Sequence, residues 1–238
     1  MQDWTLIGPK IPVLVWYSRL LCARRFDSAK ETITWSSITA KEYSSFKGKV
    51  LLLIHGTGLR SQAGFLGITE SEFNILHEQY NSQILAFEHC AIRHHLDRNS
   101  KDLVTGLEKF SNPLNLDVIG LSRGGLVMRR IVEGWTKIRD NIRINSLVFV
   151  GTPNDGTPSA RRNNFKVGAK EMQAWRRDVR RVALVNQQAR EAKIASRTDT
   201  LFDSPEEGKS YLTWPILKGT QDLVPNSNML DILNGFCE

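Results

Sequence analysis

The sequence predicts an α/β fold in which helices cover both faces of a mostly parallel β-sheet. Apolar runs of strand length recur along the chain, at residues 49–54, 83–87, 116–119 and 146–150. Segments with helical spacing of apolar residues lie between them, most clearly at residues 99–110. This alternation is typical of a parallel sheet, because consecutive parallel strands need a crossover connection.

The run at residues 49–54 ends in a glycine-containing turn. It has no polar side chain after Lys49, and His55-Gly56-Thr57-Gly58 follow it directly. Glycine in such a turn allows the main chain to approach a bound group closely. The simpler interpretation is an ordinary strand-to-helix turn with a capping threonine, and this segment alone does not decide between the two.

A serine stands at the apex of a second turn. Gly120-Leu121-Ser122-Arg123-Gly124 follows the run at 116–119, and helical spacing begins at Arg123. A G-x-S-x-G between a strand and a helix is the pattern of a nucleophile elbow, in which glycines relieve the crowding of strand against helix. Chance occurrence in a glycine-rich turn is the simpler alternative, but both flanking elements are of the right kind.

Several motifs support a family resemblance over residues 50–157. These are V-L-L-L-I-H-G-T at 50–57, L-A-F-E-H at 85–89, S-R-G-G-L-V at 122–127 and V-F-V-G-T-P-N-D-G-T at 148–157. Together they resemble the core of lipase-like α/β-hydrolases. The most similar group is bacterial, is related to the inositol-deacylase and lipase families, and often occurs with protease-like CHAT modules. That group usually has histidine before the serine, where this chain has Leu121.

The resemblance implies a three-layer α/β-hydrolase fold and a serine nucleophile at Ser122. It also implies an oxyanion hole, formed by the backbone N–H groups of Thr57 (or Gly58) and Arg123. The remaining motif residues are then structural: His55, Gly56, Gly120 and Gly124. No cofactor or metal is expected.

A general base is harder to find. A serine hydroxyl needs a base and an orienting carboxylate, and in this fold the chain order is serine, acid, histidine. All the histidines precede Ser122: His55, His77, His89, His94 and His95. The last three follow the run at 83–87, about 9.6 Å from the serine strand if one strand lies between. A loop histidine could cross that gap, although a surface position is the simpler interpretation.

Asp222 is the candidate acid, and two interpretations of its segment stay open. The residues around it fit the G-x-x-D-x-x-V-P with which a late strand ends in many α/β-hydrolases. They also fit a segment of the bacterial group, G-x-Q-x-M-x-P-x-S-x-x-L-x-x-L-N, which precedes the last core strands and has no catalytic role. Under either interpretation we expect the chain to lack the last strand and helix of the fold, and the base with them.

Composition favours one domain over residues 1–238, with a core at about 46–157 and a basic helical cap at about 158–210. The net charge of +7 is concentrated in residues 161–193. That stretch is a possible contact for anionic surfaces, and a solvated helix face is the simpler interpretation. Nucleic-acid binding is not favoured, since no recognition motif accompanies the charge. The three cysteines are odd in number and far apart, so they predict no disulfide framework, which favours a reducing, cytoplasmic location. No segment is long enough for a membrane span or typical of a signal peptide.

These observations predict a serine hydrolase of the lipase or esterase type. It would cleave a carboxylic ester, on an ester or lipid-like substrate, through an acyl-enzyme at Ser122. The alternative is a truncated or inactive hydrolase domain that serves as an interaction module. Without a base, we expect little or no hydrolysis of activated esters.

Overall fold

The structure is a computed structural model of the chain. It describes residues 18–30, 32–57, 60–65, 67–91, 94–134, 138–157, 221–223, 225 and 227–234. Two predictions fall outside these residues: the basic cap at 158–210 with its stretch at 161–193, and the role of Gly58.

The described strands form one six-stranded sheet in the order β2-β1-β4-β3-β5-β6. The four strands from β3 to β6 run parallel to one another. Strand β1 is antiparallel to both β4 and β2. The fold is therefore α/β with a mixed, mostly parallel sheet, as the sequence predicted. The strand bounds are β1 Arg19–Asp27, β2 Thr32–Ser37, β3 Gly48–Ile54, β4 Ile84–Glu88, β5 Leu114–Leu121 and β6 Ile142–Val150.

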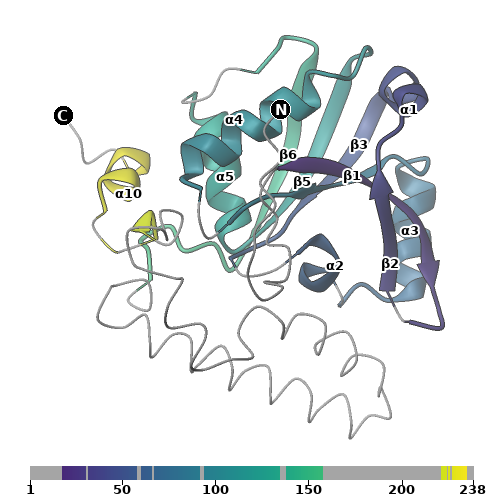
Figure 1. The fold of residues 1–238 in the computed structure, drawn as a ribbon, viewed down its shortest axis with the longest axis horizontal. Coiled ribbons are helices and arrows are strands. Elements are labelled where there is room, and N and C mark those ends of the chain that lie inside the picture. The colour runs from purple at the N-terminus through teal and green to yellow at the C-terminus, as the bar shows by residue number, and fades with distance from the viewer. Residues whose placement is uncertain are drawn as a thin grey trace, which may run out of the picture.

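Helices alternate with the parallel strands and cover both faces of the sheet (Figure 1). Helices α4 and α5 lie on one face, whereas α3 lies on the other. The helix bounds are α1 Ala40–Ser45, α2 Ser61–Gly64, α3 Glu70–Gln79, α4 Leu96–Leu107, α5 Arg123–Val132 and α10 Asn228–Leu233.

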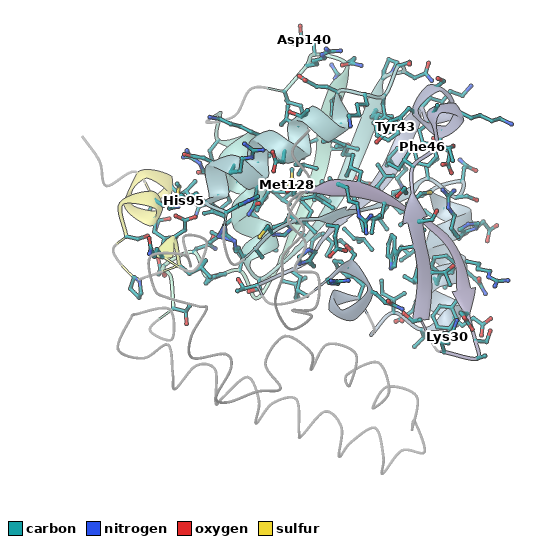
Figure 2. All side chains as sticks on the ribbon, viewed as in Figure 1. Lys30, Tyr43, Phe46, His95, Met128 and Asp140 are labelled. Atoms are coloured by element: carbon teal, nitrogen blue, oxygen red, sulfur yellow. The ribbon has the colours of Figure 1, made fainter. Side chains whose placement is uncertain are left out.

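Strand β3 shows how the sequence produces these layers. Its residues from Val50 to Ile54 are at most 2% exposed, so the strand is buried on both faces. Side chains alternate along a strand. Val50, Leu52 and Ile54 pack with α4 and α5, and Leu51 and Leu53 pack with Phe73 of α3. Met128 of α5, labelled in Figure 2, belongs to the first of these layers.

The β1–β2 hairpin was not predicted from the sequence. Its register slips between Ala23 and Arg25. Leu20 and Cys22 belong to the α4 layer, and Leu21 and Ala23 belong to the α3 layer. Both layers therefore extend over β1, which makes the hairpin part of the same core.

Candidate active site

Ser122 is the single residue between the last residue of β5 and the first residue of α5. Its backbone has φ 52° and ψ −122°, in a region that residues with a side chain rarely adopt. Its N–H donates to the carbonyl of Val150 at 2.7 Å, and its carbonyl accepts from Gly125 N–H at 3.0 Å. Ser122 thus lies at the carboxyl edge of the sheet, on a tight and strained turn.

Two glycines make room for this turn. A Cβ built on Gly124 would lie 2.3 Å from the carbonyl oxygen of Ile54, the last residue of β3. A Cβ on Gly120 would lie 2.7 Å from the Cα of Gly125. Both clashes are with backbone atoms, which cannot rotate away. The G-x-S-x-G spacing therefore follows from the close approach of α5 to β5 and β3.

The turn after β3 lies against Ser122. A Cβ on Gly56 would come within 2.9 Å of the Cβ and 3.4 Å of the Oγ of Ser122. This places Gly56 beside the serine at the same edge of the sheet, so the two turns that the sequence singled out meet.

His55 fixes the orientation of the peptide group between Gly56 and Thr57. Its Nε2 accepts the N–H of His89 at 3.2 Å, which leaves the ring proton on Nδ1 to donate to the carbonyl of Gly56 at 2.8 Å. Because C=O and N–H point in opposite directions across a trans peptide, the N–H of Thr57 faces away from this ring. His55 therefore holds the loop, as a structural residue would.

Buried polar side chains gather behind this loop. His55 stacks on His89 with ring centroids 4.2 Å apart, and both side chains are shielded from solvent. Burial lowers the pKa of His55, and it lowers the pKa of His89 well below its usual value. Both rings are thus neutral at pH 7. A surface position was the simpler expectation for His89, and the structure shows it buried at 2% exposure.

Asp222 lies at the start of α4. Its carboxylate accepts the backbone N–H of Leu96 at 2.7 Å and contacts Nδ1 of His95 at 2.8 Å. The helix has His95 as its N-cap, and that side chain makes no capping hydrogen bond. Asp222 supplies the missing acceptor from a distant part of the sequence. Within the described residues, no hydrogen bond joins a histidine ring to the Ser122 hydroxyl.

Arg123 has a side chain that sequence reasoning did not single out. The residue is fully buried, its NH2 group donates to the carbonyl of His94 at 2.6 Å, and it lies 3.6 Å from Oδ2 of Asp222. The sequence did hold one signal for its burial: Arg123 stands next to Gly124, in a turn that the glycine spacing already predicts to be crowded.

A protein-family model matches residues 22–235 of this 238-residue chain. The chain belongs to the family described as Domain of unknown function (DUF7379). No curated protein and no solved structure matches it.

The DUF7379 match extends well beyond the segments that carry the hydrolase motifs. It begins at Cys22 in β1 and takes in Asp222 and α10. The hairpin and the C-terminal segment that packs near α5 are therefore parts of the same domain as the Ser122 turn.

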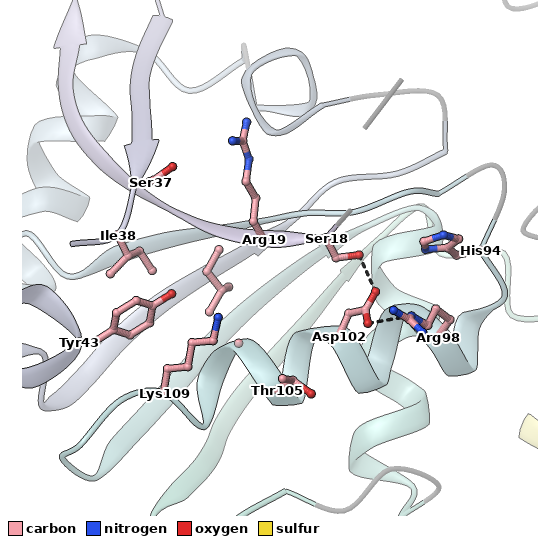
Figure 3. A pocket seen from close by; sticks show the side chains of 12 residues that line it. Ser18, Arg19, Ser37, Ile38, Tyr43, His94, Arg98, Asp102, Thr105 and Lys109 are labelled. Atoms are coloured by element: carbon pink, nitrogen blue, oxygen red, sulfur yellow. Dashed lines mark hydrogen bonds and ion pairs between the residues drawn. The ribbon is translucent and has the colours of Figure 1, made fainter. Parts of the chain in front are cut away.

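A separate cleft lies between β1 and α4 of the DUF7379 domain (Figure 3). It has a volume of about 300 Å³ and is lined by residues of both elements and by Tyr43. Asp102 bridges Ser18 and Arg98 along its wall. Ser122 does not line this cleft. The described residues contain no group of His, Cys, Asp and Glu side chains suited to a metal ion, and none of their helices is long and apolar enough to cross a membrane.

Proposed function

We propose that this DUF7379 domain is a lipase-like α/β-hydrolase that cleaves a carboxylic ester with Ser122 as nucleophile. The observation that carries the proposal is the strained Ser122 backbone, φ 52°, on a one-residue turn between a parallel strand and a helix. Strain of this kind costs about 1–3 kcal/mol and collects at functional sites.

The oxyanion hole is the second part of the proposal. Arg123 is the first residue of α5, so its backbone N–H lies at the positive end of that helix, beside Ser122. The N–H of Thr57 lies on the loop beside Ser122 and faces away from His55. Two such donors would stabilise the oxygen that gains negative charge in the transition state, and each is worth about 3–4 kcal/mol when removed.

The reaction itself has two halves. The Ser122 oxygen attacks the ester carbonyl, its proton passes to a base, and the alcohol leaves with a proton. Water then attacks the acyl-enzyme, the acid is released and the serine regains its proton. His55 and His89 are unsuited as the base, because burial lowers their pKa values, which makes the rings weak proton acceptors, and because both rings are enclosed in the core.

Labelling of Ser122 by a fluorophosphonate probe tests the nucleophile. We expect labelling of the intact protein at a single site, lost in Ser122→Ala. Without an activating base we expect that labelling to be slow. Hydrolysis of an activated ester that persists in Ser122→Ala at the wild-type rate would refute the proposal. A folded protein that never labels favours the alternative, an inactive hydrolase domain that serves as an interaction module.

His95→Gln and Asp222→Asn, measured with the same probe, test the candidate acid. The two side chains are in direct contact, with Nδ1 of His95 at 2.8 Å from Oδ1 of Asp222. If Asp222 orients His95 as the base, both variants lose labelling to the same extent. His77 offers a control, because it lies on α3, on the opposite face of the sheet.

A further inference from the structure

We propose that Asp222 and Arg123 form a buried positioning pair, which holds the first turn of α5 and therefore the Ser122 turn in place. Both side chains belong to segments about 100 residues apart, and their nearest charged atoms are 3.6 Å apart. The consequence for reactivity rests on the proposed function, whereas the existence of the coupled pair does not.

Arg123 needs a counter-ion where it lies. Its side chain has 0% exposure, and an ionised group without a partner in such a place is strongly destabilising. Burial lowers its pKa to about 10, and the negative charge of Asp222 opposes that shift. The guanidinium therefore remains charged at pH 7, and the nearby carboxylate balances it.

Asp222 is itself held on several sides. It is 4% exposed, and its carboxylate also binds the N–H of Leu96 and the ring of His95. Leu96 begins α4, just as Arg123 begins α5. The carboxylate thus lies at the positive end of α4, where a negative charge is favourable, and also contacts the guanidinium of the residue that begins α5.

The pair acts on the serine through the chain. Arg123 is bonded to Ser122, and its NH2 group also holds the carbonyl of His94. If the side chain of Arg123 is released, the peptide between Ser122 and Arg123 is free to rotate toward ordinary backbone angles. That rotation would turn the Arg123 N–H, one of the two proposed oxyanion donors. Asp222 would then support catalysis as a positioning residue.

A double-mutant cycle tests the pair without reference to activity. The variants are Arg123→Met, Asp222→Asn and the combination, each unfolded in urea. Losing one partner of a buried pair typically costs 3–5 kcal/mol. We therefore expect each single change to raise the unfolding equilibrium constant roughly 100-fold or more, at about 1.4 kcal/mol per tenfold. The double variant should be no less stable than the worse single variant. If the stability losses of the two single variants simply add in the double variant, the two side chains are not coupled and the proposed pair is wrong.

Two further variants keep the test decisive if Arg123→Met does not fold. Arg123→Lys retains a cation, and we expect it to fold and to recover part of the stability lost in Arg123→Met. Glu133→Gln is the matched control, because it breaks the more exposed pair of Arg129 and Glu133 on the same helix. It should change the unfolding equilibrium constant by less than about fivefold.

The rate of fluorophosphonate labelling at Ser122 then separates positioning from acid catalysis. As a positioning pair, Arg123→Met and Asp222→Asn slow labelling to a similar extent, and Arg123→Lys partly restores it. If Asp222→Asn slows labelling together with His95→Gln while Arg123→Met does not, Asp222 is an acid behind a base and the positioning role is wrong. If wild-type protein does not label at all, the proposed function fails, and the stability cycle still decides whether the pair exists.

Discussion

Gly124→Ala is the sharpest test of the turn geometry. The new methyl carbon would lie 2.3 Å from the carbonyl oxygen of Ile54 and 3.0 Å from that of His55. A carbon and a carbonyl oxygen normally approach to about 3.3 Å, so about 1 Å of movement is needed. The obstructing atoms are backbone at the end of the central strand β3, which cannot move without its neighbours.

The expected loss of stability follows from two opposing effects. Overpacking of this kind costs about 3 kcal/mol at the upper end of its usual range. Alanine inside a helix gains about 1 kcal/mol over glycine. The net loss should be about 2 kcal/mol in the free energy of unfolding by urea. Labelling at Ser122 should also slow by roughly 100-fold, because the serine turn shifts by about 1 Å.

Gly67→Ala is the matched control for this substitution. A Cβ on Gly67 would meet nothing within 4 Å. We expect its free energy of unfolding to stay within about 0.5 kcal/mol of wild type, with unchanged labelling. If Gly124→Ala is as stable and as reactive as Gly67→Ala, the close approach of α5 to β3 is wrong, and the steric account of the G-x-S-x-G spacing is wrong with it.

Two further predictions concern charge and hydrogen bonding. The folded-state pKa values of His55 and His89 lie below the unfolded value of 6.5, so stability is full above that pH and falls as the pH drops below it. Urea unfolding between pH 7.5 and 5 should show stability that falls as the pH drops, with His89 contributing up to about 1.4 kcal/mol per pH unit and a smaller slope in His89→Gln; a flat profile would contradict this. Asp117 accepts hydrogen bonds from Tyr80, Asn145 and Ser146. Asp117→Ala should therefore cost on the order of 3 kcal/mol and Asp117→Asn clearly less, and equal stability of the two would refute that reasoning.

The sequence predicted the parallel part of the fold well because its strands are apolar on both faces. Residues 50–54 contain only valine, leucine and isoleucine, and such a run indicates a central strand regardless of its neighbours. The hairpin was harder, because Arg19, Arg24 and Arg25 interrupt its apolar positions. The hairpin is buried because α3 and α4 pack on its two faces, and the residues of the hairpin itself do not indicate that packing.

The candidate site also has a part that the sequence predicts and a part that it does not. The Ser122 turn and the loop at Gly56 could be predicted, because glycine spacing reports local crowding. The partners of Asp222 could not, because His95 lies 127 residues and Arg123 about 100 residues away in sequence, and both meet it only in the folded chain. One of the two segment interpretations made Asp222 a catalytic acid and the other did not; neither could predict that its carboxylate caps α4 and contacts the guanidinium of Arg123.

The backbone at Ser122 links these local and distant features. Asn81 and Ser82 also have positive φ, at 49° and 64°, but they form an exposed turn between α3 and β4, where asparagine adopts this conformation readily. Ser122 has no such freedom: Gly56 lies against its side chain, Val150 binds its N–H, and Arg123 is tied to Asp222. A serine persists in a strained conformation only where its surroundings over-determine it. Contacts from the turn after β3, from the last residue of β6 and from the segment at Asp222 converge on this one residue. A nucleophile that must present its hydroxyl in a fixed direction is the function that such convergence supports best.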